Sequence, residues 1–336
     1  MTRRQRVIAI SASAGVAALG LAIGLIVALT GSSAPPPAPA PTSPSPSPVR
    51  LLSPFTGEPV PSLETVVAVK IDNIKQARPP TGLKSADIIY ALPVEGGLSR
   101  LMAVFSSRFP PVIGPVRSAR EDDLELLRQF GKPGFAYSGA TPHLLPFIHR
   151  AQVVDLYAGT ASGYFRDPRR PAPHNLYAHS AALLTQAKAG GASKARDIGF
   201  RFGPLPAGGR VVSSYSVSYP AASFTFRWSA RDERWLVWMD GVPAKAVEGG
   251  QLGGATVVIQ YTVVRTSRFL EYGSRPPYAE SVGSGRAVVL RNGHAFDVRW
   301  SRPNPNVGTA FTLPAGQRMM FAPGQVWVIL AAAPAK

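Results

Sequence analysis

Apolar residues occur in short runs over residues 64–200, and helix-like stretches separate these runs. Each run is rich in β-branched or aromatic residues and is bounded by Gly, Pro or Asp, which predicts a strand. The predicted strands are residues 65–71 (TVVAVKI), 86–92 (ADIIYAL), 101–107 (LMAVFSS) and 134–139 (GFAYSG). Strands interleaved with helices indicate an α/β domain with a mixed sheet.

Three segments in the same half predict helices. In residues 118–133 (SAREDDLELLRQFGKP) the apolar positions share one face, and Gly131 ends the pattern. Ser118 and Glu121 have the spacing of a capping box, in which each side chain bonds the other's backbone N–H. The two shorter predicted helices are residues 141–151 and 177–191.

From residue 211 onward, apolar and polar positions alternate. Phe224, Phe226 and Trp228 recur with a period of two, which is typical of strands with one buried face. Asn292 and Gly293 lie between two alternating segments and are a strong signal for a two-residue hairpin. The second half therefore predicts an antiparallel all-β domain with Phe and Trp in its core.

The first thirty residues differ from the rest of the chain. Residues 1–6 are basic, and residues 7–30 are an uncharged segment longer than the ~20 residues a helix needs to cross a bilayer. We expect a transmembrane anchor with the remaining chain outside the membrane, because basic residues stay on the cytoplasmic side. The alternative is a cleaved signal peptide, for which residues 32–34 offer a small-residue cleavage site.

Composition divides the chain into four parts. A spacer of Pro, Ala, Ser and Thr follows the N-terminal segment, and residues 203–209 (GPLPAGG) separate the two halves. The predicted parts are a basic tip with a transmembrane anchor or signal peptide, a linker, an α/β domain and a β-rich domain, at residues 1–33, 34–50, 51–205 and 206–336.

The absence of cysteine excludes disulfides, thiol catalysis and thiolate metal sites. The formal net charge is +17, but the arginines are scattered and no zinc or helix-turn-helix spacing is present, so we expect no nucleic-acid partner. Anionic surfaces such as phospholipid headgroups or wall polyanions are the expected partners. The alternative is a generally basic composition without a specific partner.

Residues 114–121 (GPVRSARE) place Arg117 and Arg120 beside a predicted helix start. Cations are unfavourable there unless negative charge accompanies them. The acids at residues 121–123 supply such charge to Arg120. Arg117 precedes the helix and, together with backbone N–H groups, is suited to hold an anion. An anion site and an internal ion-pair network both remain open.

Further polar residues follow predicted strands or lie in proline-stiffened loops, where open α/β sheets commonly bind ligands. Acid–base chemistry is available from Asp72, Glu95 and His174. The residues suited to ligand binding are Asn73, Arg78, Arg100, Arg117, Ser118, Arg120, Arg170 and Asn175. The alternative for each is a turn former or a hydrogen-bonder within its loop.

Three segments of the first half resemble the YerB-like family of proposed bacterial lipoproteins. They are TVVAVKIDNIKQARPPTGLKSADIIYALPVEGGLSRLMAVF (65–105), IGPVRSARE (113–121) and YFRDPRRPAPHNLY (164–177). The likeness extends over residues 54–332 and is looser in the second half. It implies an exported, membrane-tethered protein with an α/β domain and a β-rich domain, both of unknown function. Family members typically carry a lipidated cysteine, which this chain lacks, so the apolar N-terminal segment would provide the anchor.

The polar residues singled out above fall within these segments. We therefore expect them to converge on one cleft in the first domain. Separation of Glu95, Arg117 and His174 onto different faces would contradict this.

Three functions fit these features. A binding protein of the cell envelope would hold the carboxylate or phosphate of an anionic wall or lipid-linked component, or bind an envelope protein. A hydrolase or transferase acting on the wall would use Glu95 or Asp72 with His174, although no GxSxG or HExxH motif is present. A scaffold would use the arginines only as braces. We expect no cofactor and no metal site; Asp72, Glu95 and His174 are the one set suited to a divalent metal.

Overall fold

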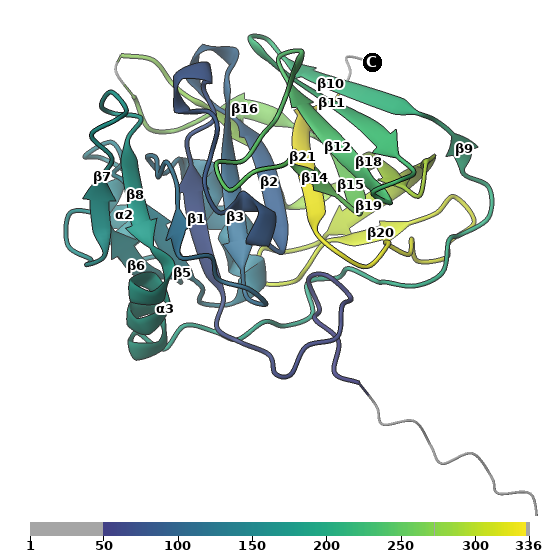
Figure 1. Ribbon diagram of the computed structural model, residues 1–336, viewed down its shortest axis with the longest axis horizontal. Coiled ribbons are helices and arrows are strands. Elements are labelled where there is room, and N and C mark those ends of the chain that lie inside the picture. Colours follow the sequence, from purple (N-terminus) through teal and green to yellow (C-terminus); the bar gives the residue numbers. More distant parts are fainter. Residues whose placement is uncertain (1–49, 272, 334–336) are drawn as a thin grey trace, which may run out of the picture. The chain divides into compact units, whose positions relative to one another are not determined.

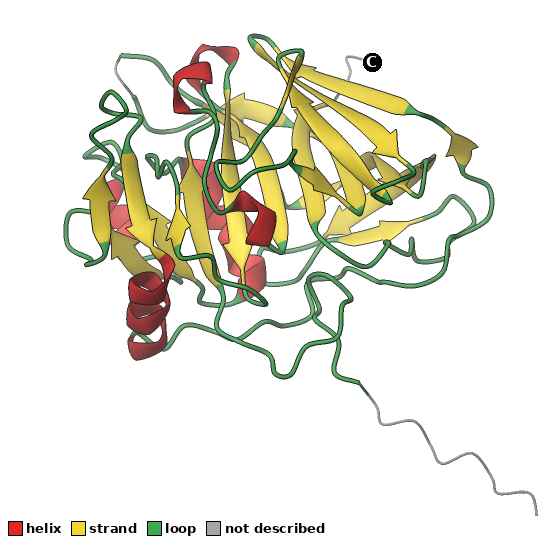
Figure 2. Ribbon diagram, in the orientation of Figure 1, coloured by secondary structure: helices red, strands yellow, loops and turns green. Residues whose placement is uncertain are grey.

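The computed structural model describes residues 50–271 and 273–333, and strands dominate this part of the chain (Figure 2). The α-helices here are short: α1 (Glu121–Leu127), α2 (Leu145–His149) and α3 (Ser180–Ala189). Four single-turn 3-10 helices accompany them: η1 (Lys75–Ala77), η2 (Leu83–Ser85), η3 (Glu95–Gly97) and η4 (Arg128–Phe130).

The largest element is an 11-stranded sheet. Its strands are β1 (Val67–Ile71), β2 (Ile88–Pro93), β3 (Ser99–Phe105), β5 (Gly134–Tyr137), β6 (Val154–Tyr157), β9 (Arg210–Val211), β15 (Thr256–Thr262), β18 (Gly283–Arg291), β19 (His294–Arg302), β20 (Ala310–Thr312) and β21 (Val326–Ala332). Their order is β20-β19-β18-β15-β21-β2-β3-β1-β5-β6, with β9 beside β19.

Three smaller sheets complete the fold (Figure 1). One contains β10 (Ser214–Tyr219), β11 (Ala222–Ser229), β12 (Arg234–Met239), β13 (Val242–Pro243) and β14 (Gly253–Gly254). A second pairs β16 (Val264–Thr266) with β17 (Pro277–Ala279), and the third joins β4 (Val112–Ile113), β7 (Tyr164–Arg166) and β8 (Leu176–His179).

The large sheet is buried on both faces. On one face, Phe224 and Trp235 of the five-stranded sheet pack in the same apolar cluster as Trp327 of β21. On the other face, Leu126 and Leu127 of α1 belong to the cluster that contains Val328. Because both faces are covered, central strands such as β1 and β21 are almost continuously apolar and do not alternate.

The predicted fold class is wrong. The chain is mostly strands with few helices, and the second half does not form a separate antiparallel all-β domain. β21 pairs in parallel with both β15 and β2, so strands from the two halves share one mixed sheet. The apolar edge of β2 needs a partner, and β21 covers it. The predicted domain bounds, 51–205 and 206–336, stay a prediction.

The predicted transmembrane helix over residues 7–30 lies outside the described residues. Within residues 50–271 and 273–333, no helix has the length and apolar character needed to cross a membrane.

Several local predictions are confirmed. Strands are present in all four predicted segments of the first half, as β1, β2, β3 and β5. The Asn292–Gly293 turn joins β18 to β19, with Arg291 paired to His294. The segment 177–191 was predicted as one helix, but its first residues belong to β8 and only the remainder forms α3.

The segments that follow three strands lie at the same end of the sheet. β1 and β2 both run antiparallel to β3, and β5 runs parallel to β1, so β1, β2 and β5 point the same way. Asp72 follows β1, Glu95 follows β2 and Ser138 follows β5. This edge carries the candidate site.

Candidate functional site

Asp72 contacts two other predicted site residues, Arg117 and His174. Its Oδ2 lies 2.7 Å from His174 Nδ1 and 3.3 Å from Arg117 Nε. The Asp72 side chain is 1% exposed, whereas those of His174 and Arg117 are 16% and 23% exposed. With Asp72 as a carboxylate, Nδ1 carries the proton of this hydrogen bond, so Nε2 of a neutral His174 is free to accept a proton.

Glu95 contacts two further predicted arginines, Arg100 and Arg120. Its Oε1 accepts a hydrogen bond from Arg120 Nε, and its Oε2 lies 3.8 Å from Arg100. Burial raises the pKa of Glu95, but the charge and hydrogen bond of Arg120 outweigh it, and the net pKa is lowered. Glu95 is therefore an ion-pair partner in the ionised state and not a protonated acid at neutral pH.

Arg100 joins the two groups. Its NH1 donates to the carbonyl of Ser118 at 3.1 Å, one residue after Arg117. Burial lowers the pKa of Arg100 to about 10, and the charges of Arg120 and Arg117 act in the same direction. We name the seven residues Asp72, Glu95, Arg100, Arg117, Arg120, His174 and Glu271 the arginine cluster.

Glu271 was missed by the sequence reasoning. It lies between β16 and β17, and its Oε1 is 3.2 Å from Arg120 NH2. Its Oε2 is buried without a hydrogen-bond partner in the described part of the chain, and burial raises its pKa. Nothing in the local pattern marks this glutamate, because its partner lies about 150 residues earlier and only the tertiary fold joins them.

The helix start differs from the predicted capping box. The helix begins at Glu121, and Asp123 Oδ2 accepts the Arg120 N–H at 2.7 Å. Ser118 lies too early to cap; its Oγ is 3.5 Å from Ser138 Oγ. Glu121 instead bonds Ser267 and Arg268, so neither Glu121 nor Asp123 neutralises the Arg120 guanidinium.

Arg78 and Asn73 form hydrogen bonds that stabilise the loop after β1. Arg78 donates to Asp240 Oδ2 at 2.8 Å and to the Asn73 carbonyl at 2.6 Å, which ties the loop after β1 to the β12–β13 turn. The Asn73 amide is buried and donates to Ser99 at 2.9 Å. Neither side chain joins the arginine cluster.

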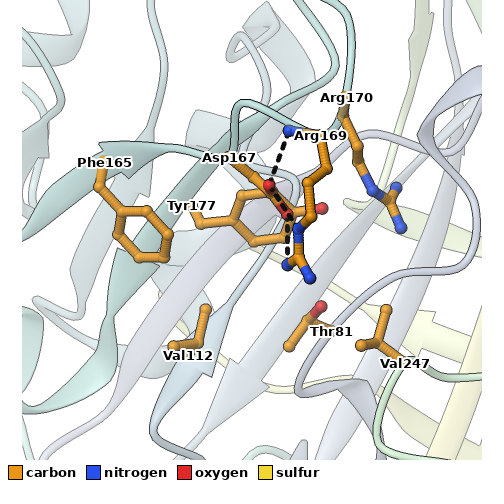
Figure 3. A pocket seen from close by; sticks show the side chains of 8 residues that line it. All are labelled: Thr81, Val112, Phe165, Asp167, Arg169, Arg170, Tyr177 and Val247. Atoms are coloured by element: carbon orange, nitrogen blue, oxygen red, sulfur yellow. Dashed lines mark hydrogen bonds and ion pairs between the residues drawn. The ribbon is translucent and has the colours of Figure 1, made fainter.

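Arg170 and Asn175 also lie apart from the arginine cluster. Arg170 donates to the carbonyls of Ala77 and Pro79, and Asn175 bonds Arg166 and the Asp167 carbonyl. Figure 3 shows Arg169, Arg170 and Tyr177 among the side chains that line a hollow of about 470 Å³, with Arg169 paired with Asp167. Arg170 and Asn175 stiffen the loop that presents His174.

The structure thus places Glu95, Arg117 and His174 at the same end of the sheet; that they form one ligand-binding cleft stays a prediction. All three cluster arginines have an intramolecular acid, but Arg117 meets its acid only through Nε, and its two terminal nitrogens have no hydrogen-bond acceptor within residues 50–271 and 273–333. No group of three or more His, Asp or Glu side chains in this range is arranged to hold a metal ion. The accessible chemistry is that of one guanidinium beside one carboxylate-held imidazole.

Comparisons with known proteins bear on the same segments. Residues 55–193 match the family described as "Protein of unknown function (DUF3048) N-terminal domain", and residues 215–328 match its C-terminal domain. The chain is 26% identical over 293 residues to "Putative lipoprotein YerB" of Bacillus subtilis (strain 168), which covers 83% of this chain and 86% of that protein. The chain therefore belongs to the YerB-like family.

A crystal structure of the YerB protein from Bacillus subtilis has the same fold. It superposes with a TM-score of 0.71 at 22% identity, over 83% of this chain and 96% of that one.

Proposed function

We propose that this chain is an envelope-associated binding protein whose Arg117 and His174 recognise an anionic group of an envelope component. The likeness to "Putative lipoprotein YerB" supports this location, because lipoproteins are a class of proteins that lie outside the cytoplasm at a membrane. Because this chain has no cysteine, any tether would differ from that of a lipoprotein.

One observation carries the proposal. Arg117 uses only Nε on Asp72, and its side chain stays 23% exposed beside an imidazole that is also partly exposed. A guanidinium fixed at one nitrogen presents its terminal N–H groups in a preset plane, which suits a carboxylate or a phosphate. Ordering the arginine beforehand reduces the entropy lost on binding.

The charge balance of the arginine cluster supports an anion over a cation. Three arginines face Asp72, Glu95 and Glu271, and Glu271 is the acid whose pKa burial raises. The cluster is therefore neutral or positive before His174 gains a proton. When the cluster is positive, an incoming anion lowers its electrostatic energy, whereas a cation raises it.

Binding can be tested with three soluble probes: inorganic phosphate, a short-chain isoprenyl diphosphate and a disaccharide–tripeptide wall fragment. Isothermal titration should detect at least one of them, and Arg117→Ala should weaken it about tenfold or more, since such contacts contribute about 1.5–3 kcal/mol. Arg117→Lys should recover only part of the affinity.

The matched control is Arg169→Ala, which removes an 86% exposed arginine from a different hollow. It should leave the dissociation constant unchanged. Equal affinities for the parent chain, Arg117→Ala and Arg169→Ala would contradict the proposed site, and so would a complete lack of binding by all three probes.

A second candidate is a wall-directed hydrolase or transferase. The 2.7 Å contact of His174 with Asp72 favours it, because a carboxylate that orients imidazole is a common general-base arrangement. Release of product from the wall fragment, abolished by His174→Gln but retained in Arg169→Ala, would establish this activity. No turnover with intact binding would leave the binding function.

A further inference from the structure

A cavity of about 620 Å³ lies beyond the carboxyl ends of β2 and β21. The loop after β2, the β10–β11 turn and strand β16 line it. It shares Glu95 with the arginine cluster, but its other walls are separate from Arg117 and His174.

One wall of the cavity is preformed. The N–H of Ala221 in the β10–β11 turn donates to the Gly97 carbonyl at 2.9 Å. A Cβ on Gly97 would lie 2.7 Å from Pro220 Cβ, and Gly97 has φ +70°, so only glycine fits this close approach. Tyr219 is anchored by its hydroxyl, which donates to the Leu330 carbonyl at 2.9 Å.

The opposite wall is an open strand edge. β16 has one neighbour within the described residues, β17, and the antiparallel register pairs Arg265 with Tyr278. The bonds Glu280 N–H to Val263 O and Ser267 N–H to Pro276 O flank this pair. Hydrogen-bonded pairs recur every second residue, so the backbone N–H groups of Val264 and Thr266 point away from β17.

The charged residues that line the cavity determine which kind of peptide the edge of β16 can bind. Arg265 and Arg275 line the cavity, and its one acid, Glu95, is already paired with Arg120. Arg265 is held over the Tyr278 ring at 3.7 Å, and Arg275 NH1 donates to the Ser267 carbonyl at 3.1 Å. Arg265 Nε also pairs with Glu280 Oε1 at 3.1 Å, so Arg275 is the lining cation without an acidic partner among the described residues.

We propose that β16 binds an extended acidic peptide segment of a partner protein, which adds a strand to the β16–β17 sheet. The three residues of β16 offer about 10 Å of strand edge. Main-chain hydrogen bonds to Val264 and Thr266 give affinity, and an acidic side chain beside Arg275 gives specificity. This site goes beyond the proposed anion site, because it recognises a polypeptide backbone and does not use Arg117.

The test starts from a displayed library of random decapeptides selected on the purified full chain, with Thr266→Pro as the counter-target. Thr266 has no N–H in the β16–β17 ladder, so proline removes the outward donor and leaves the sheet paired. Enriched peptides should be acidic and rich in β-branched residues. Fluorescence anisotropy of labelled peptides should show about tenfold weaker binding to Thr266→Pro and nearly unchanged binding to Thr266→Ala.

Further variants separate backbone pairing from charge. Arg275→Ala should weaken binding about fivefold and flatten its salt dependence, whereas Arg286→Ala, an exposed arginine of β18, should not. N-methylation of alternate peptide nitrogens should abolish binding to the parent chain. That peptide arm keeps the test decisive even where Thr266→Pro fails to fold.

Three outcomes would overturn the proposal. These are neutral or basic selected peptides, equal binding to Thr266→Pro with a normal melting temperature, and selection of no peptide that prefers the parent chain. Arg117→Ala should leave peptide affinity unchanged, so failure of the anion site and failure of the peptide site are distinguishable.

Discussion

Two charged residues, Lys70 in strand β1 and Asp72 directly after it, lie in very different surroundings. Lys70 Nζ lies 2.5 Å from Asp123 Oδ1, and both side chains are fully buried. Asp72 is almost as buried, but its partners Arg117 and His174 reach the surface. Both acids form ion pairs, yet only the second group retains polar atoms open to a ligand.

This difference shows how to distinguish an ion pair that only stabilises the fold, here called a brace, from a candidate binding site within one network. A fully enclosed ion pair has no access, and its loss leaves an uncompensated buried charge. A partly exposed cation with spare donors gains little stability from its partner, since solvent screens the pair. The number of partners of the cation and its exposure distinguish the Lys70 pair from the Asp72 group. The presence of a nearby acid does not, because both have one.

The largest expected effect is at the buried pair. Lys70→Met should lower the free energy of unfolding by about 3–5 kcal/mol, because Asp123 would be left unpaired beside Asp122. Urea denaturation measures the change, and Lys75→Met, at an exposed lysine, is the matched control. A loss below about 1 kcal/mol would show that Lys70 is not a brace.

The next effect is at Arg120, whose side chain is 4% exposed and touches both Glu95 and Glu271. Arg120→Ala should cost about 2–3 kcal/mol, since Glu271 loses its partner and Glu95 keeps only Arg100 at 3.8 Å. Adding Glu271→Gln should restore part of this loss, as it removes one uncompensated charge. A double variant no more stable than Arg120→Ala would argue against this account.

Asp122 should give stability a pH dependence. Burial, reinforced by the charge of Asp123, raises the pKa of Asp122 to about 7 from 3.8. The folded state then binds the proton more tightly than the unfolded state, so this contribution to stability is present below pH 4 and is lost as the pH rises to 7.

Asp122→Asn should therefore gain stability steadily relative to the parent chain as the pH rises from 4 to 7. Parallel urea midpoints across that range measure the difference between the two chains. A constant difference would mean that Asp122 does not titrate in this window.

The smallest expected stability effect is at Arg117. Arg117→Ala should cost less than about 1 kcal/mol, because the pair is partly exposed and Asp72 keeps His174 as a partner. The melting temperatures of Arg117→Ala and Arg120→Ala, compared directly, are the sharpest test of the difference between these two arginines. Equal losses for the two arginines would make Arg117 a brace and remove the distinction between them.

Local patterns predicted the parts of the fold that depend on near neighbours. The apolar runs at β1, β2, β3 and β5 and the hairpin at Asn292 are confirmed, since hydrophobic runs and turn residues act over a few positions. The predicted capping box is wrong because the helix begins at Glu121 with Arg120 as its N-cap, so Asp123 accepts the N-cap N–H and Ser118 faces Ser138 instead.

The sequence by itself determined which residue types were available for chemistry: no thiols, many arginines, and Asp72, Glu95 and His174 in separate polar segments. Tertiary structure alone decided that β21 would join β2, that Glu271 would reach Arg120, and that Arg78 would be tied to Asp240. The reason is physical. Strand pairing and buried ion pairs join residues more than a hundred positions apart, and their energies depend on burial and geometry that no local pattern encodes.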